Sequence, residues 1–368
     1  MVKEEKSLGE MLTEDIERVG EMVEGGIKLK GVGGDVVIGL KEKEMGAEEI
    51  RFRLKKAYKI ICEIIEDYMD IDKKLQPIKN LWIDLIGTYF HKSFPTFPYL
   101  FLNAMKGSGK TRLLNIIKNL SNKGDLLNSP TEAVLFRTEG TLCIDEFEGV
   151  SRKGNENLRE LLNSAYKKGT KVKRMRKAKT MEGEQQVVEE FEVYRPIVIA
   201  NIWGMETVLS DRCLSFILDR SDDPRITRLV EVFDNDDRFE NVTTLLNPFE
   251  ECSKCNYMPQ GIYTGWNAYV RNRINKTTHT TQTNNYTNNT NSPFYDKVFN
   301  TNINGRNLEL SLPLFVIANI LGDKFLNKLI KVMSEVVFER KDEDFLENKD
   351  VGVIDFISQE ENRNFQSV

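Results

Sequence analysis

The chain has 368 residues, of which 40% are hydrophobic and 30% charged, and its formal net charge at pH 7 is −5. This composition allows most of the chain to bury a core, and five cysteines spread over its length make a poor disulfide framework. No apolar run reaches the roughly 18–20 residues of a membrane span, and the charged N-terminal segment lacks the apolar stretch of a signal peptide. We therefore expect a cytoplasmic protein that has no membrane partner.

Residues 1–74 predict an N-terminal extension that is mainly helical. A glycine-rich stretch over Gly25–Gly34 precedes a short strand candidate at Asp35–Leu40. Residues 47–68 place apolar side chains at helical spacing, and a second helix is expected at Gln76–Phe90. We interpret these elements as scaffold.

Residues 75–228 predict the core of the protein. From Tyr99 to Arg220, short apolar runs alternate with helical patterns: YLFLNA, TLCIDEF, PIVIAN and FILD, with helices from Lys110 and near Asn157–Lys167. Continuous apolar runs between helices are typical of a parallel sheet covered on both faces. The expected fold class is a three-layer α/β core.

Beyond residue 228 the pattern weakens. We expect an irregular insertion over 229–302, because residues 275–292 form a Thr/Asn-rich tract with little to bury. Helical order resumes at 308–338, within a small helical lid and tail over 303–368. Cys252 and Cys255 form a lone CxxC without a second ligand pair, which leaves zinc binding open. His91 follows an aromatic run and is interpreted as a packed histidine.

The segment after YLFLNA resembles a Walker A motif, which binds the phosphates of a nucleotide. Gly107 and Gly109 permit backbone N–H groups to turn inward, and the following helix N-terminus adds partial positive charge. Lys110 can reach the β- and γ-phosphates of ATP, and the Thr111 hydroxyl can bind Mg²⁺. Ala104 stands where the motif has its first glycine, and the alternative is an ordinary glycine-rich turn. The expected phosphate loop comprises Lys106, Gly107, Ser108, Gly109, Lys110 and Thr111.

Polar residues at the ends of two later strands complete the expected chemistry. Thr141–Phe147 reads TLCIDEF, in which Asp145 can hold Mg²⁺ and Glu146 can deprotonate the attacking water. The alternative is an acidic helix cap. Asn201 ends the next strand, where it can contact the γ-phosphate and the water, or simply form a turn.

Two arginines follow the strand that ends at Asn201. Arg212 and Arg220 are candidates for an arginine finger, which stabilises the charge of the transition state. Either residue could instead form a surface ion pair.

This order of motifs resembles the AAA+ ATPases. Several strings are similar to those of a poorly characterised protein family that is found in phages, plasmids and their hosts and is related to replicative helicases. The likeness covers about residues 75–220 and 303–335. They are FPYLFLNAMKGSGKTRLL, SPTEAVLFRTEGTLCIDEFEG, LLNSAYKKGTKVKR, YRPIVIANI, LSDRCLSFIL and GRNLELSLPLFVIANILG. Viral superfamily 3 and minichromosome-maintenance helicases share this general layout.

The resemblance implies an ATP-dependent DNA helicase or translocase in the replication of a mobile element, assembled as a homo-oligomeric, hexameric ring. By the same resemblance Arg212 would be a finger acting on a neighbour's ATP, and Arg306 a sensor-2-like arginine. Ala104 and the Asn-rich insertion depart from the pattern. The alternatives are a protein-remodelling or loader ATPase and a nucleotide-gated switch.

A basic segment supports contact with single-stranded or duplex DNA despite the negative net charge. Residues 167–179 contain eight lysines and arginines in thirteen positions, and Gln185–Tyr194 can pair back with a turn near 180–184. In hexameric helicases of the resembled kind, a hairpin in this place projects into the channel, where basic residues neutralise phosphates. The alternative is a solvated face paired with the nearby glutamates of 182–192.

Overall fold

The computed structural model describes residues 22–23, 26–31, 34–39, 47–70, 82–128, 130–145, 147, 156–180, 183–202, 205–230, 233–252, 258–278 and 293–337. Its centre is a five-stranded sheet in which every neighbouring pair is parallel. The strand order is β10-β4-β9-β6-β5. The strands are β4 (Tyr99–Ala104), β5 (Asp125–Leu127), β6 (Leu142–Ile144), β9 (Ile197–Asn201) and β10 (Cys213–Leu218).

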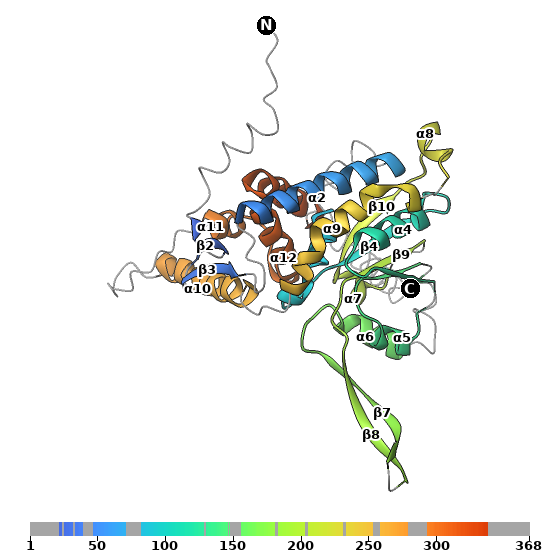
Figure 1. The fold of residues 1–368 in the computed structure, drawn as a ribbon. Helices are drawn as coiled ribbons and strands as arrows, with labels where there is room; N and C mark the ends of the chain where they lie inside the picture. The colour runs from blue at the N-terminus through green and yellow to red at the C-terminus, as the bar shows by residue number, and fades with distance from the viewer. Residues whose placement is uncertain are drawn as a thin grey trace, which may run out of the picture.

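Helices cover both faces of this sheet, so the predicted three-layer arrangement is confirmed (Figure 1). Alternate residues of β4 enter different cores: Leu100 and Leu102 pack on one side, and Tyr99 and Phe101 on the other. This alternation follows from the pleat, because successive strand side chains point to opposite faces. The first side carries α2 (Ala47–Tyr68), α4 (Lys110–Leu120), α9 (Asp237–Cys252) and α12 (Gly305–Leu321). The second carries α5 (Glu132–Arg137), α6 (Glu156–Ser164) and α7 (Thr207–Ser210).

The N-terminal part of the chain combines strands with the predicted helix. β1 (Met22–Val23), β2 (Gly26–Gly31) and β3 (Gly34–Gly39) form an antiparallel sheet, where the sequence predicted a strand only near β3. Glycines stand at both ends of β2 and of β3, and this chemistry suits the tight reversal at Gly31↔Gly34. The helix predicted over 47–68 is confirmed by α2. Of the second predicted helix, 76–81 lies outside the described residues and α3 spans Ile83–Gly87.

Regular helices also occupy much of 229–302, where we expected an irregular insertion. α9 places Phe239, Val242, Leu246 and Phe249 in the core at helical spacing, despite Pro248 inside the helix. α10 (Met258–Thr278) and α11 (Pro293–Phe299) pack through aromatic rings, including Trp266 with Tyr295 at 5.9 Å between centroids. The Thr/Asn-rich tract beyond residue 278 lies outside the described residues, as does Cys255.

The remaining helices complete the side of the sheet that carries α2. The helical pattern predicted at 308–338 is confirmed by α12 and a helix over 323–337. η2 (His91–Ser93) and the short helices α8 (Pro224–Thr227) and η4 (Phe233–Asn235) lie in connections. Of the helices in the described part of the chain, none combines the length and apolarity that crossing a membrane requires.

Candidate functional site

The strand order places a crevice at the carboxyl end of β4. The chain leaves β4 through α4 and crosses to β5 at the far edge, while β9 and β10 later take the positions on either side of β4. Ligands of open parallel sheets bind where the order of strands switches in this way, outside the carboxyl ends of the strands. The ends of β4, β6 and β9 meet there.

The connection from β4 to α4 turns sharply at two glycines. Gly107 and Gly109 adopt φ angles of 82° and 84°, which are left-handed conformations that favour glycine. Gly109 directly precedes Lys110, the first residue of α4. The first backbone N–H groups of a helix lack intrahelical partners and carry partial positive charge, so this helix start favours an anion.

Three side chains meet at the mouth of this loop. The Lys110 Nζ lies 2.9 Å from Oδ1 of Asp145, and the Thr111 hydroxyl donates to Oδ2 of the same carboxylate at 2.8 Å. The side chains of Lys110 and Asp145 are only 12% and 9% exposed. Asp145 directly follows β6, so the sheet brings together residues 34 positions apart in the sequence.

A cleft of about 650 Å³ opens in front of these residues. Its walls are the loop over 105–109, the two residues that follow α2, Met69 and Asp70, and parts of 219–227. Asp70 accepts a hydrogen bond from the Ser221 hydroxyl at 2.5 Å, which joins two of the walls. This volume lies within the range of roughly 300–1,000 Å³ that is usual for small-molecule and cofactor pockets.

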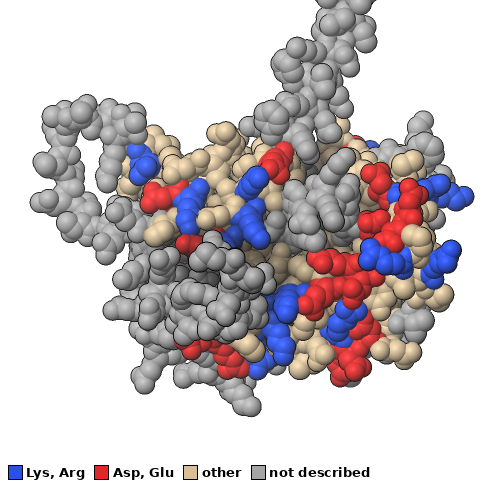
Figure 2. Space-filling model, turned by 90° about the horizontal axis from the view of Figure 1, so that it is seen from above, with Lys and Arg blue, Asp and Glu red and all other residues tan. Residues whose placement is uncertain are grey.

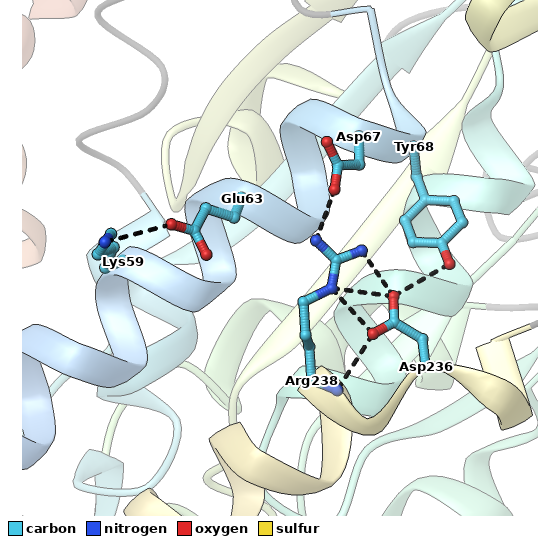
Figure 3. A network of polar contacts seen from close by, with 6 residues as sticks. All are labelled: Lys59, Glu63, Asp67, Tyr68, Asp236 and Arg238. Atoms are coloured by element: carbon cyan, nitrogen blue, oxygen red, sulfur yellow. Dashed lines mark hydrogen bonds and ion pairs between the residues drawn. The ribbon is translucent and has the colours of Figure 1, made fainter.

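A polar network fixes the wall formed by α2 (Figure 3). Arg238 at the start of α9 bonds both carboxylate oxygens of Asp236 and reaches Asp67 on α2 at 2.5 Å. The Tyr68 hydroxyl donates to Asp236 at 3.1 Å. Hydrogen bonding from Arg238 lowers the pKa of Asp236 below its usual value. The network therefore anchors the end of α2 beside the cleft, in contacts that the sequence patterns did not predict.

Other site residues that the sequence predicted lie near the same carboxyl end of the strands. Asn201 ends β9 in register with Asn103 of β4 and is buried, and its side-chain oxygen accepts the N–H of Ile202 at 2.8 Å. Ser108 is buried in the loop and its hydroxyl has no hydrogen-bond partner. The carbonyl of Lys106 accepts a hydrogen bond from Arg220 at 2.6 Å. Glu146 lies outside the described residues.

Arg212 and Arg306 lie together at the opposite end of the strands, where β4 and β10 begin. Arg212 immediately precedes β10, and its carbonyl accepts the N–H of Tyr99 at the start of β4. The ring of Tyr166 lies 5.3 Å from Cζ of Arg212 and 4.9 Å from Cζ of Arg306. Five residue steps along β4 separate this edge from the loop, which corresponds to about 17 Å. The structure therefore does not bring either arginine to Lys110 of the same chain.

This arginine cluster is tied down by neighbouring groups. Arg306 pairs with Glu309 at 2.8 Å and with Asp211 at 3.4 Å, and it donates to the Tyr166 hydroxyl. Arg212 donates to the carbonyl of Asn163 at 2.8 Å. Both guanidinium groups thus lie on one surface formed by α6, α7 and the start of α12.

The predicted hairpin is confirmed. β7 (Lys171–Thr180) pairs antiparallel with β8 (Gly183–Glu192) and projects beyond the helical layers (Figure 1). Near its base, Lys171 and Lys173 pair with Glu190 at 3.0 and 3.1 Å, and Arg174 pairs with Glu132 on α5. Hydrogen bonds from Lys171 and Lys173 lower the pKa of Glu190. The alternative of mutually paired charges therefore holds for the base of the hairpin.

The outer part of the hairpin carries the rest of the basic residues. Register places Lys177 opposite Gln186 and Lys179 opposite Glu184, next to the turn. The side chains of 176–185 are outside the described set, so their positions come from the strand register alone. Met175 and Val188 form a cross-strand pair and are 61% and 52% exposed.

His91 is a packed residue, as predicted. Its side chain is 2% exposed, and Nδ1 lies 2.7 Å from the carbonyl oxygen of Thr88. Burial lowers the pKa of His91 to about 4. Among the described residues no cluster of His, Cys, Asp and Glu side chains forms a metal site of its own.

Comparison with known proteins gives little beyond this geometry. The sequence matches no protein-family profile and no curated protein. Ten chains of solved structures are similar. One is a crystal structure of the JCV helicase bound to a thiazolopyridinyl-phenoxyphenyl acetamide, with 18% identity and a TM-score of 0.30. The match covers 54% of this chain and 53% of the other, about half its length, and its score is too low to support a functional argument.

Proposed function

We propose that this protein is an AAA+ ATPase that binds ATP with Mg²⁺ and hydrolyses it. The observation that carries the proposal is the convergence of Lys110, Thr111 and Asp145 at a helix N-terminus on the carboxyl edge of a parallel sheet. In this reading the loop over 106–109 supplies backbone N–H groups to the phosphates, and Lys110 supplies a cation.

The donor set at this position suits Mg²⁺. The ion prefers oxygen ligands and usually uses one or two carboxylates together with substrate phosphates and water. The Thr111 hydroxyl and the Asp145 carboxylate, which share a hydrogen bond, are such ligands. When bound, Mg²⁺ would neutralise negative charge on the phosphates. Lys110 would exchange Asp145 for the phosphates as the nucleotide binds.

Hydrolysis would use residues that follow β6 and β9. Glu146 would accept a proton from the attacking water, and Asn201 would orient that water through its amide. Asn201 is held at the end of β9, where its side-chain oxygen accepts the N–H of Ile202.

A ring of identical subunits would complete the site. Arg212 lies at the amino end of the strands, remote from Lys110 of its own chain. This distance supports a role for Arg212 in hydrolysis of a neighbour's ATP. Arg306 shares the Tyr166 surface with Arg212, so we assign it to the same subunit interface rather than to its own chain's ATP. The division into extension, core, insertion and lid at residues 74, 228 and 302 remains part of the proposal.

The favoured task is translocation on DNA, or its unwinding, in the replication of a mobile element. The hairpin supports this task because it projects from the core and its outer part carries Lys177, which lies opposite the neutral Gln186 in the strand register. Figure 2 shows acidic and basic side chains mixed on the described surface seen there, so nucleic-acid contact is assigned to the hairpin rather than to that face.

A second candidate is a protein-remodelling or loader ATPase. It is favoured by the ion pairs of Lys171, Lys173 and Arg174, which use up charge at the hairpin base. In this case the hairpin would be an ordinary surface element.

Phosphate release from ATP, measured with and without single-stranded DNA, tests the proposal. Hydrolysis that DNA stimulates supports the translocase, and hydrolysis indifferent to DNA favours the remodelling ATPase. A Lys110→Ala protein serves as the control, because it removes the cation of the loop. Equal phosphate release by both proteins would contradict the site assignment.

A further inference from the structure

The base of the hairpin has an inward and an outward face. Val172 packs against the core beneath α5 and α6, and Arg174 pairs with Glu132 of α5, so the face that carries these two residues is turned toward the protein. Side chains alternate between the two faces along a strand, which places their neighbours on the outward face. The outward face of the base consists of three cross-strand pairs: Lys171 with Glu192, Lys173 with Glu190, and Met175 with Val188.

This outward face separates its charges by strand. Its lysines belong to β7 and its glutamates to β8, with the exposed pair of Met175 and Val188 next to them. Lys171 and Lys173 are exposed and both bond Glu190, so one carboxylate serves two cations. The hairpin therefore has a basic side along β7 and an acidic side along β8.

Both sides end in edges that can accept another strand. The sheet of β7 and β8 has two strands, so among the described strands neither has a neighbour on its outer edge. Such edges present backbone N–H and C=O groups for pairing with another chain, and an isolated two-stranded ribbon has little stability of its own. A cleft of about 700 Å³ beside β8 is lined by Arg137, Glu189, Glu190 and Phe191. Its two carboxylates and one guanidinium suit a basic partner.

We propose that the basic side of one hairpin packs beside the acidic side of the hairpin of a second copy of this chain, with Met175 of one copy next to Val188 of the other. The partner follows from charge, because opposite charges on adjacent strands stabilise pairing and like charges oppose it. Each hairpin bears one sign on each side, so the contact repeats head to tail, as closure of a ring requires. The inference rests on the ring in the proposed function and leaves Lys177 and Lys179 to nucleic acid.

Cross-linking between two cysteine variants tests this contact. Met175→Cys protein assembled with Val188→Cys protein, without nucleic acid, should give a covalent dimer with a short bismaleimide. The wild-type protein gives the background from the native cysteines. Lys59→Cys assembled with Val188→Cys is the matched control, because Lys59 is also exposed but lies on α2, across the central sheet from α5. This control should give no more dimer than the background.

Charge reversal separates contacts between chains from those within one chain. Adding Lys173→Glu to the Met175→Cys protein, or Glu190→Lys to the Val188→Cys protein, should lower the dimer yield by about 2- to 5-fold, the range for one exposed charge pair. Combining the two reversed proteins should restore the yield, because Glu at 173 then meets Lys at 190 of the other copy. Repulsion within each chain persists in that mixture, so it cannot produce the recovery.

The outcomes separate this inference from the proposed function. Thermal unfolding checks that each variant is folded, and the cysteine pair alone carries the test if a charge variant is not. A dimer yield no higher than that of the Lys59→Cys control, in protein that sedimentation velocity shows to be assembled, would overturn the inference and leave the ring intact. Cross-linking that requires added single-stranded DNA would also overturn it, because nucleic acid would then be the partner of this face. A protein that stays monomeric with ATP and Mg²⁺ would overturn the ring itself.

Discussion

The ion pair between Lys110 and Asp145 should stabilise the fold even without a nucleotide. The two charges are 2.9 Å apart, and neither side chain is more than 12% exposed. Coulomb's law gives an attraction of about 6 kcal/mol at this distance with an effective dielectric constant of about 20. Desolvation of both charges offsets much of it, so we expect a net coupling of about 2 kcal/mol.

Three variants measure this coupling: Lys110→Met, Asp145→Asn and the double variant. Lys110→Met alone should cost about 3 kcal/mol in free energy of unfolding, because it removes the cation paired with a carboxylate that is only 9% exposed. The double variant should recover part of this loss. Urea unfolding without nucleotide gives all the required free energies.

The exposed pair of Lys59 and Glu63 on α2 is the control. Its atoms are 3.6 Å apart and its side chains are 63% and 48% exposed (Figure 3). The same cycle there should give a coupling of about 0.3–0.5 kcal/mol. A coupling between Lys110 and Asp145 no larger than this would refute the argument that the two form a buried pair in the ligand-free protein.

Three further predictions concern chemistry, nucleic acid and pH. Glu146→Gln should bind ATP normally but release phosphate roughly 10²–10⁴-fold more slowly, because an amide cannot accept the proton of water; near wild-type turnover would show that another group is the base. Replacing Lys177 and Lys179 by Ala should flatten the salt dependence of single-stranded DNA binding by roughly 1–1.5 in log–log slope, at about 0.7 for each phosphate contact. An unchanged slope in anisotropy titrations would favour the remodelling ATPase. Arg238→Met should lower the free energy of unfolding by about 1 kcal/mol, since its partners are partly solvated. Because Arg238 lowers the pKa of Asp236, this stabilisation is present above the unfolded pKa of about 3.9 and is lost as the pH falls through the folded value. Urea unfolding of both proteins should therefore show a difference that shrinks as the pH falls below about 3.9, and a constant difference would contradict the linkage.

Local patterns predicted the elements of the core well. The apolar runs at 99–104 and 197–201 are short and continuous, as strands buried on both faces require, and the glycines at 107 and 109 mark the turn into α4. The hairpin was also predictable, because its two strands are joined by a short turn and bear opposite charges. In α9 the helical spacing was present, but the Thr/Asn-rich tract over 275–292 led us to expect an irregular segment from residue 229 onward.

Contacts between distant segments could not be predicted in the same way. The approach of α2 to the cleft depends on Arg238 reaching Asp67 across 171 positions, and neither residue belongs to a motif. The position of Arg220 beside Lys106 depends on the pairing of β10 with β4, which apolar runs alone do not specify. The same uncertainty applied to Arg306, whose place beside Tyr166 is set by the packing of α12.

Direct binding of ATP tests the central claim most simply. Calorimetric titration of the full chain with ATP, in the presence of Mg²⁺, should show saturable binding at one site for each subunit. The Lys110→Ala protein, shown to be folded by circular dichroism, should lose that binding, because the loop would lack its principal cation. Equal affinity of the two proteins for ATP, or no binding by the wild-type protein, would contradict the account.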